Sequence, residues 1–306
     1  MLSESNQRVE IVEVGPRDGL QNETATLSTA LKTELIQRLI QAGIHRIEVA
    51  SFVNPKLVAQ MADAEEVLAQ VSRQPGVTRV GLVLNRRGLE RAIAAGCDEV
   101  GLVAVATDSF GRHNQGADRE RAIDICEELV PLAKSAGMSV QITLSVAFGC
   151  PYEGEVPAER VLDICKRLAA LGPRELALAD TIGVAVPMQV QHLFEHVRAF
   201  APNLHLRGHF HNTRNTALAN IMAAYQSGVR IFDSSIGGIG GCPFAPRASG
   251  NVATEDVVYL LERSGIRTGL SLARLIDTAQ WLEHCLGHAL PGMLHRAGEF
   301  PYGTQG

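Results

Sequence analysis

Several features that mark other classes of protein are missing from this 306-residue sequence. No apolar run approaches the length needed to span a bilayer, and the opening residues MLSESNQR contain no apolar signal core. No basic run occurs, and the net charge of −5 at pH 7 argues against a surface for nucleic acid or anionic membranes. We therefore expect a soluble chain without a presequence and without nucleic-acid or membrane partners.

The cysteines do not form a recognisable framework, because no CxxC motif and no disulfide-like spacing occurs among them. The six are Cys97, Cys126, Cys150, Cys165, Cys242 and Cys285. In a chain of this length, scattered cysteines indicate reduced thiols. We therefore expect a cytoplasmic location.

What the sequence does contain is a regular alternation of β-branched runs and amphipathic stretches. The expected strands are 9–14, 45–51, 79–84, 99–104, 139–146, 176–179, 204–211 and 230–235. The expected helices are 28–41, 56–71, 87–95, 118–136, 157–171, 187–200, 217–226 and 254–264. Eight strand–helix units in unbroken order predict an α/β fold, a (β/α)8 TIM barrel. A doubly wound open sheet is the alternative, but no glycine-rich phosphate turn follows the first strand.

The end of the chain departs from this alternation. One more helix is expected at 272–286, and a tail rich in glycine and proline follows it. We therefore predict a catalytic barrel over residues 1–269. Residues 270–306 are expected to form a C-terminal helical appendage that packs on the barrel and is not a separate domain.

Polar residues gather where the expected strands end. In a (β/α)8 barrel the carboxyl ends of the strands converge on one mouth, which carries the active site. The residues expected there are Arg17, Asp18, Glu48, Ser51, Asn85, Asp180, Thr181, His209 and His211. This concentration favours a functional site over an incidental surface ion pair.

Two histidines in this group have the spacing of metal ligands. His209 and His211 are two residues apart on one strand, so both rings point to the same face. With Asp18 at the same mouth and the amide oxygen of Asn251, they form an oxygen and nitrogen donor set. Such a set suits Mg²⁺, Mn²⁺ or Fe²⁺ better than a closed zinc site, which would favour thiolates. A hydrogen-bonded pair of core histidines is the alternative.

Cys242 differs from the other cysteines because it lies in a glycine-dense segment, residues 237–251, next to Pro243. Glycines pack poorly as core, so the segment favours a loop that moves over a ligand. A simple extended turn is the alternative. The remaining cysteines are interpreted as small buried residues.

At this point the sequence resembles a known family, that of 3-hydroxy-3-methylglutaryl-CoA lyase. The matching segments are VGPRDGLQNE (14–23), IEVASFV (47–53), GCPYEG (149–154), ADTIG (179–183), HFH (209–211), GGCPFA (240–245) and ASGNVATED (248–256). They follow one another in order from the first strand to the helix after the eighth. The resemblance implies a (β/α)8-barrel lyase that acts on an acyl-CoA thioester, with Mg²⁺ or Mn²⁺ as cofactor. The implied metal ligands are Asp18, His209, His211 and Asn251.

The resemblance also implies a reaction, the retro-Claisen cleavage of a 3-hydroxy-3-methylglutaryl-CoA-type thioester to acetyl-CoA and acetoacetate. Such a lyase serves leucine catabolism and ketone-body formation. The resemblance implies substrate contact by Arg17 and a catalytic Cys242. We further expect catalytic roles for Arg17, His209 and Asp18, and substrate contacts from Gln21, Glu48, Ser51 and Asp180. Arg17 would neutralise the enolate oxygen of the departing acetyl-CoA, Cys242 would protonate the enolate carbon, and His209 is the candidate base.

Three departures from the family pattern bear on the substrate, and they lie at Asn212, Asn215 and Pro246-Arg247. They leave open a related 3-hydroxy-3-alkylglutaryl-CoA as the preferred substrate. Two rival functions also stay open, a Claisen-type synthase of the isopropylmalate or homocitrate synthase kind and a non-catalytic barrel with a structural metal. We also expect a homo-oligomer, a dimer or tetramer.

The strand that carries the histidines contains a further charge at Arg207. By strand periodicity Arg207 should point into the barrel one layer below the metal. A buried guanidinium needs a carboxylate partner, and the expected candidates are Glu13, Glu48 and Asp180.

Overall fold

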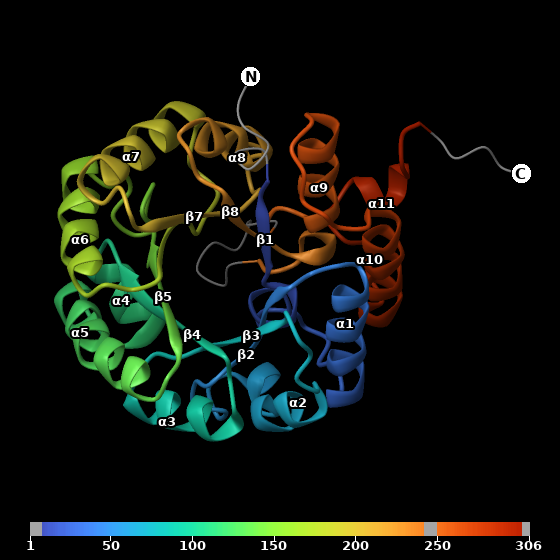
Figure 1. The fold of residues 1–306 in the computed structure, drawn as a ribbon, viewed down its shortest axis with the longest axis horizontal. Helices are drawn as coiled ribbons and strands as arrows, with labels where there is room; N and C mark the ends of the chain where they lie inside the picture. The colour runs from blue at the N-terminus through green and yellow to red at the C-terminus, as the bar shows by residue number, and fades with distance from the viewer. Residues whose placement is uncertain (1–7, 242–249, 302–306) are drawn as a thin grey trace, which may run out of the picture.

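The described chain forms a closed barrel of eight parallel strands that are hydrogen-bonded in sequence order, from β1 to β8 and back to β1 (Figure 1). The computed structural model describes residues 8–241 and 250–301. The strands are β1 (Glu10–Glu13), β2 (Arg46–Ser51), β3 (Thr78–Leu82), β4 (Glu99–Val105), β5 (Ser139–Ser145), β6 (Glu175–Asp180), β7 (His205–Phe210) and β8 (Ile231–Ser234). The predicted TIM barrel is confirmed.

Helices surround the barrel on its outer side (Figure 1). They are α1 (Thr29–Gln41), α2 (Ala64–Gln70), α3 (Arg86–Ala95), α4 (Asp108–Gln115), α5 (Arg119–Ser135), α6 (Ala158–Ala170), α7 (Pro187–Phe200), α8 (Ala217–Gln226), α9 (Thr254–Arg263), α10 (Leu272–Leu286) and α11 (Leu294–Ala297). Single helical turns occur at Gly15–Gly19, Ala59–Met61 and Ile236–Gly238. Within the described residues, no helix has the length and apolar character needed to cross a membrane.

Two expectations about the helices were wrong. The helix predicted from residue 56 begins only at Ala64, because Asn54 forms a side-chain turn to the Lys56 amide (3.1 Å) and the chain next makes a short 3₁₀ turn. Helix α4 was not predicted at all. Of its residues only Phe110 and Gly111 are buried, so its sequence carries no apolar periodicity.

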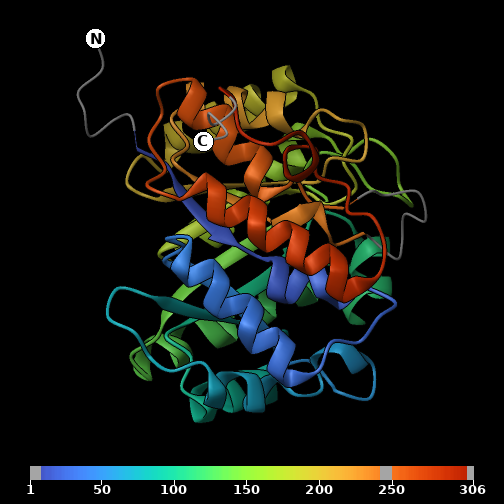
Figure 2. The same cartoon turned by 90° about the vertical axis from the view of Figure 1, so that its right-hand side faces the viewer.

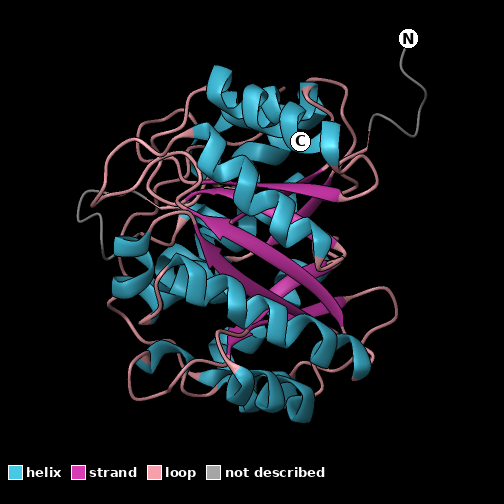
Figure 3. Cartoon of the chain, turned by 90° about the vertical axis from the view of Figure 1, so that its left-hand side faces the viewer, coloured by secondary structure: helices cyan, strands magenta, loops and turns pink. Residues whose placement is uncertain are grey.

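The apolar core lies between the barrel wall and the surrounding helices. Strands β2 and β6 are buried along their whole length, which is the pattern of parallel strands covered on both faces. The carboxyl ends of the strands all lie at one end of the barrel, where the longer loops gather (Figure 3). Residues that follow the strands are therefore brought together at this mouth.

The C-terminal helices pack on the outside of the barrel, with α10 running beside α1 and α9 (Figure 2). The guanidinium of Arg38 on α1 lies 4.7 Å from the ring centre of Trp281 on α10. The backbone amide of Ser271 donates to the carbonyl of Ala42 at 2.8 Å. The division into residues 1–269 and 270–306 remains a prediction.

Candidate active site

The first charged pair at the mouth is positioned by an unusual turn. Strand β1 leads directly into a π-helical turn, in which the amide of Gly19 donates to the carbonyl of Val14 at 3.1 Å. Such turns are rare and often occur at functional sites. A Cβ atom on Gly15 would lie 2.6 Å from Glu13 Oε1, so the tight exit from the strand needs glycine. The turn presents Arg17 and Asp18 to the cavity at the mouth.

Arg17 is held by two carboxylates. Its Nε atom donates to Glu48 Oε2 at 2.7 Å, and its Nη1 atom donates to Asp18 Oδ1 at 2.6 Å. Burial lowers the pKa of Arg17, but the charges of Glu48 and Asp18 outweigh it and raise that pKa above its ordinary value. The guanidinium is therefore a fixed, permanent positive charge that lines the cavity.

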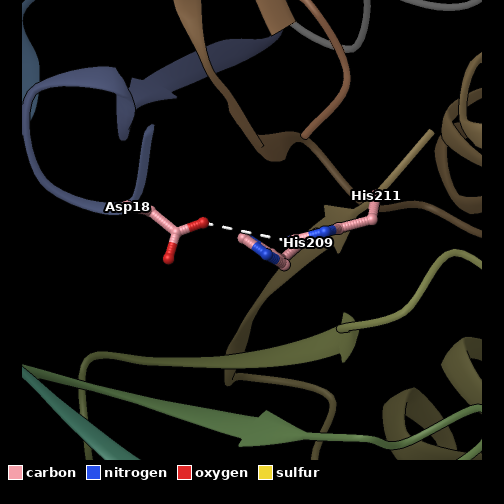
Figure 4. A group of neighbouring side chains, drawn as sticks. All are labelled: Asp18, His209 and His211. Carbon is pink, nitrogen blue, oxygen red and sulfur yellow. Dashed lines mark ion pairs between the residues drawn. The ribbon is translucent and has the colours of Figure 1, made fainter. Parts of the chain in front are cut away.

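Beside this arginine lies a group of residues that could hold a metal ion (Figure 4). Asp18, His209 and His211 each offer one ligand atom, and these atoms lie within 4.8 Å of one another. Ligands at about 2.1 Å from an octahedral cation stand roughly 3 to 4 Å apart, so only a small contraction is required. His211 Nδ1 is buried and has no hydrogen-bond partner among the described residues. The donor set and the spacing fit a divalent cation.

The protonation states of Asp18 and His211 suit a cation, whereas the hydrogen bond and charge of Asp233 raise the pKa of His209 despite its burial. Burial alone would raise the pKa of Asp18, but the charges of Arg17, His209 and His211 hold it at about 2. Burial and the neighbouring His209 lower the pKa of His211 to about 3. At neutral pH the cluster therefore contains an ionised carboxylate and a neutral His211 imidazole, which are the forms that bind metals.

The fourth predicted ligand, Asn251, lies against the same cluster. Its backbone forms an isolated bridge with His211, and its side-chain Nδ2 donates to Asp18 Oδ2 at 2.7 Å and to the carbonyl of Ile239 at 3.2 Å. The residue is thus brought to the site, while coordination through its amide oxygen remains a prediction.

We call Arg17, Asp18, Glu48, His209 and His211 the mouth cluster.

A cavity of about 920 Å³ opens at the mouth cluster. Its inner end is formed by that cluster together with Arg207 and Asp233, and Gln21 also lines it. Its outer end is formed by residues 53, 54 and 57–59 on one side and by the end of α4 on the other, with His113 and Arg121 among the lining residues. The cavity has the size of a site for a drug-sized or cofactor-sized ligand.

Two predicted substrate-binding residues do not line this cavity. Asp180 is buried and accepts hydrogen bonds from the amides of Val184 (2.8 Å) and Ala185 (3.0 Å), so it shapes the turn before α7. Burial raises the pKa of Asp180 to about 6. Strand alternation explains its place, because Ala179 faces the cavity and Asp180 must face away. Ser51 is fully buried and also lies outside the lining.

The expected partners of Arg207 were wrong. Arg207 does point into the barrel, but its Nε atom lies 3.2 Å from Glu175 Oε1 and 3.4 Å from Asp233 Oδ1. Glu13 instead accepts from the amides of Gly15 (2.8 Å) and Ile236 (2.9 Å). Burial raises the pKa of Glu13 to about 8.

Asp233 is a site residue that the sequence pattern did not reveal. Its Oδ2 atom accepts from His209 Nδ1 at 2.9 Å when the ring carries its proton there. Burial raises the pKa of Asp233, but the charge of Arg207 and the hydrogen bond from His209 outweigh it and keep that pKa below its ordinary value. The sequence did contain one signal for Asp233. It is a single acidic residue after the apolar start of β8, at a position whose side chain faces the inside of the barrel.

The three departures from the family pattern were expected to bear on the substrate, and two of them fall on described residues. Asn212 accepts from the amide of Ala217 at 3.2 Å and Asn215 has a φ of 58°, so both shape the turn before α8. Neither residue lines the cavity. Cys242 and Pro246-Arg247 lie outside the described residues.

A parallel barrel with a clamped arginine and an Asp-His-His cluster at its mouth defines a class, the barrel enzymes that work with a divalent cation. Sequence comparison then identifies the family. The HMGL-like family model matches residues 8–282, and the chain belongs to this family. The family depends on divalent metals.

Several relatives support this assignment. The chain is 42% identical over 285 residues to hydroxymethylglutaryl-CoA lyase of Bacillus subtilis, covering 93% of this chain and 95% of that one. It is 43% identical over 303 residues to (R)-citramalyl-CoA lyase of Chloroflexus aurantiacus, covering 95% of each. A solved HMG-CoA lyase of Acinetobacter baumannii matches with a TM-score of 0.94 and 38% identity, over 99% of this chain and 98% of that one. This chain is an HMG-CoA lyase-like enzyme.

Proposed function

We propose that this enzyme cleaves a 3-hydroxy-3-methylglutaryl-CoA-type thioester to acetyl-CoA and acetoacetate by metal-dependent retro-Claisen chemistry. The observation that carries the proposal is Arg17, which lines the cavity beside Asp18, His209 and His211 and is held by Glu48. This arrangement puts a fixed cation next to a candidate metal site. Both can stabilise the negative charge that develops when a carbon–carbon bond is cleaved to an enolate.

The metal site would consist of Asp18, His209, His211 and Asn251. A bound Mg²⁺ or Mn²⁺ supplies Lewis-acid polarisation of the substrate oxygens. In support, Asp18 is oriented by hydrogen bonds to its two carboxylate oxygens, one from Arg17 and one from Asn251.

Arg17 would stabilise the negative charge that develops on the thioester oxygen. Because Glu48 and Asp18 already orient its guanidinium, little reorganisation is needed during the reaction. Such a preorganised contact is worth roughly 3–4 kcal/mol in other oxyanion sites. Gln21 and Glu48 also line the cavity and are the predicted substrate-binding residues that we retain.

Cleavage requires two proton transfers, removal of the hydroxyl proton of the substrate and protonation of the enolate carbon, and we assign the second to a residue. Cys242 would protonate the enolate carbon, because a thiol with a pKa near 8.5 stays mostly protonated at neutral pH. His209 is not retained as the base. Its Nδ1 atom is engaged with Asp233, and a bound cation would use its other nitrogen.

A second substrate has specific support, because one relative that covers 95% of the chain is named (R)-citramalyl-CoA lyase. Citramalyl-CoA is one methylene shorter than HMG-CoA, and one methylene is worth only about 1–3 kcal/mol of discrimination. The A. baumannii enzyme, a structural neighbour, was solved with coenzyme A and 3-methylmalate. A homo-oligomeric state and a cytoplasmic location remain part of the proposal, and relatives carry both mitochondrial and cytoplasmic names.

The test is an assay of the purified protein with Mg²⁺ or Mn²⁺ and a panel of thioesters. We expect acetyl-CoA to appear with HMG-CoA together with acetoacetate, and chelator to abolish it. Pyruvate formed faster from (R)-citramalyl-CoA would reassign the substrate. Acetyl-CoA consumption with a 2-oxo acid would identify a Claisen synthase, and no reaction with any thioester would refute the proposal.

A further inference from the structure

Below the mouth cluster, the barrel interior contains further buried charges. They are Arg46, Glu99, Glu175, Arg207 and Asp233, and each is at most 4% exposed. They come from β2, β4, β6, β7 and β8, so their side chains meet on the barrel axis. We call Arg46, Glu99 and Glu175 the floor cluster. Arg207 and Asp233 lie between this cluster and the metal site.

The contacts form one continuous path. His209 Nδ1 lies 2.9 Å from Asp233 Oδ2, and the other oxygen of Asp233 lies 3.4 Å from Arg207 Nε. Arg207 Nε lies 3.2 Å from Glu175 Oε1, and its Nη2 atom donates to Thr143 Oγ1 at 3.0 Å. Asp233 is therefore hydrogen-bonded to the ring through one oxygen and forms an ion pair with the guanidinium through the other, since neither Arg207 Nε nor Asp233 Oδ1 has a hydrogen-bond partner among the described residues.

The two histidines of the mouth cluster differ in this respect. His209 has a carboxylate on its Nδ1 atom, whereas His211 Nδ1 is buried without a hydrogen-bond partner among the described residues. A carboxylate on one ring nitrogen fixes the tautomer and the ring orientation, and directs the other nitrogen toward the ligand. Of the two rings, His209 is the one with this support.

Buried ion pairs of this kind are weak evidence for stability, since apolar residues of similar volume often replace them at no cost. Arg207 nevertheless offsets the charge of Asp233, because it is the arginine within ion-pair distance of Asp233 among the described residues, whereas Glu175 is also paired with Arg46. Arg207 also attracts the Asp233 oxygen that His209 does not use, through the ion pair at 3.4 Å. The ion pair with Arg207 therefore favours one orientation of the Asp233 carboxylate.

We propose that Asp233 and Arg207 are positioning residues for His209. Asp233 fixes the imidazole with its proton on Nδ1 and its Nε2 atom toward Asp18 and His211, and Arg207 fixes Asp233. The inference rests on the metal site of the proposed function. Its direct consequence is on cation affinity, which is measured without any turnover.

The first experiment titrates metal-free, full-length protein with Mn²⁺, monitored by electron paramagnetic resonance and calorimetry. Loss of an outer contact to a ligand typically weakens metal binding by roughly 10- to 100-fold, and we expect this for Asp233→Asn. Asp98→Asn is the matched control, because Asp98 also pairs with a buried arginine, Arg79 (2.9 Å), on β3 outside the site. That variant should bind Mn²⁺ like the wild type even if it is less stable.

A second pair of variants keeps the test decisive if Asp233→Asn does not fold. Arg207→Gln removes the charge and Arg207→Lys keeps it, so we expect Mn²⁺ affinity to fall several-fold in the first and to be partly restored in the second. ¹⁵N NMR of the metal-free protein should show His209 as the Nδ1–H tautomer in the wild type and a mixture of tautomers after Asp233→Asn. A structural role alone would not produce this signature.

The outcomes are separable. Mn²⁺ affinity within two-fold of the wild type in Asp233→Asn or, where that variant does not fold, in Arg207→Gln would overturn the inference, as would an unchanged tautomer of His209. Wild-type protein that binds no Mn²⁺ would overturn both the inference and the metal site. Wild-type protein that binds Mn²⁺ with the expected losses in the variants, but cleaves no thioester, would refute the proposed function alone.

Discussion

The two ends of the barrel interior differ in how completely their charged groups are paired. In the floor cluster, all four carboxylate oxygens of Glu99 and Glu175 contact an arginine at 3.2 Å or less. In the mouth cluster, Arg17 and Asp18 keep side-chain exposures of 13% and 19%, and His211 Nδ1 is without a partner among the described residues. The floor is a closed ionic network, and the mouth retains open positions.

This difference separates stability from function. A buried charge whose partner is removed destabilises the fold, whereas a polar group that faces a cavity with an open position can receive a ligand. Substitutions at the mouth should therefore change turnover and leave unfolding largely unaffected. Substitutions at the floor should do the reverse.

The largest effect on turnover is expected for Cys242→Ser. Serine keeps the size but is a much weaker acid, and loss of a general acid typically costs about 10²- to 10⁴-fold. The measurement is kcat with HMG-CoA, alongside Mn²⁺ affinity and thermal unfolding, both of which should be unchanged. Cys285→Ser on α10 is the matched control. If Cys242→Ser kept most of its activity, the proton donor would have to be sought elsewhere.

The next effect is expected for Arg17→Gln, with a fall in kcat of about 10²- to 10³-fold and little change in KM, because the charge matters most in the transition state. Arg17→Lys should recover little, since an ammonium cannot reproduce the planar contacts to Glu48 and Asp18. Arg121→Gln, at the outer end of the cavity, should instead change KM. Near-normal kcat with a raised KM in Arg17→Gln would make Arg17 an ordinary binding group.

Substitutions in the floor cluster should lower the free energy of unfolding and leave turnover largely unchanged. Glu99→Gln leaves Arg46 fully buried with one carboxylate fewer, and breaking such a pair typically costs about 3–5 kcal/mol. Chemical denaturation would measure this, while kcat per folded enzyme should stay near the wild-type value. The control is Glu90→Gln, whose exposed pair with Arg86 should contribute less than about 1 kcal/mol. A floor variant as stable as the control would remove the distinction between the two ends.

The sequence predicted the mouth better than the floor, for a physical reason. Residues that follow strands meet at the mouth of any such barrel, so Arg17, Asp18 and the two histidines could be grouped without knowing the register. Partners inside the barrel depend on the stagger between strands, which places Arg207 level with Ile231 of β8 and Ala177 of β6. Its acidic partners were therefore misassigned.

Two further misses have local causes. Asp180 was expected at the substrate because it ends a strand, but alternation from Ala179 turns it outward to the backbone amides of the next turn. Helix α4 contributes to the outer cavity wall, yet its polar sequence DSFGRHNQ shows no apolar period. Gly116 ends it in the left-handed conformation, which was the one available signal.

The smallest effect is expected at a third buried charge group, between the barrel and the appendage. His295 lies 3.3 Å from Glu255 and 3.1 Å from Glu283, and the hydrogen bond and charge of Glu255 raise the pKa of His295 despite its burial. A raised pKa in the folded state adds stability that is complete below about 6.5, the unfolded value, and is lost as pH rises through the folded value. The free energy of unfolding should therefore fall between about pH 6 and pH 8 by more in the wild type than in His295→Gln. The control is His284→Gln at an exposed position, which should show the same fall in unfolding free energy between about pH 6 and pH 8 as the wild type. If His295→Gln also showed the wild-type fall, the charge of His295 beside Glu255 and Glu283 would not stabilise the fold, unlike the charges of the floor cluster.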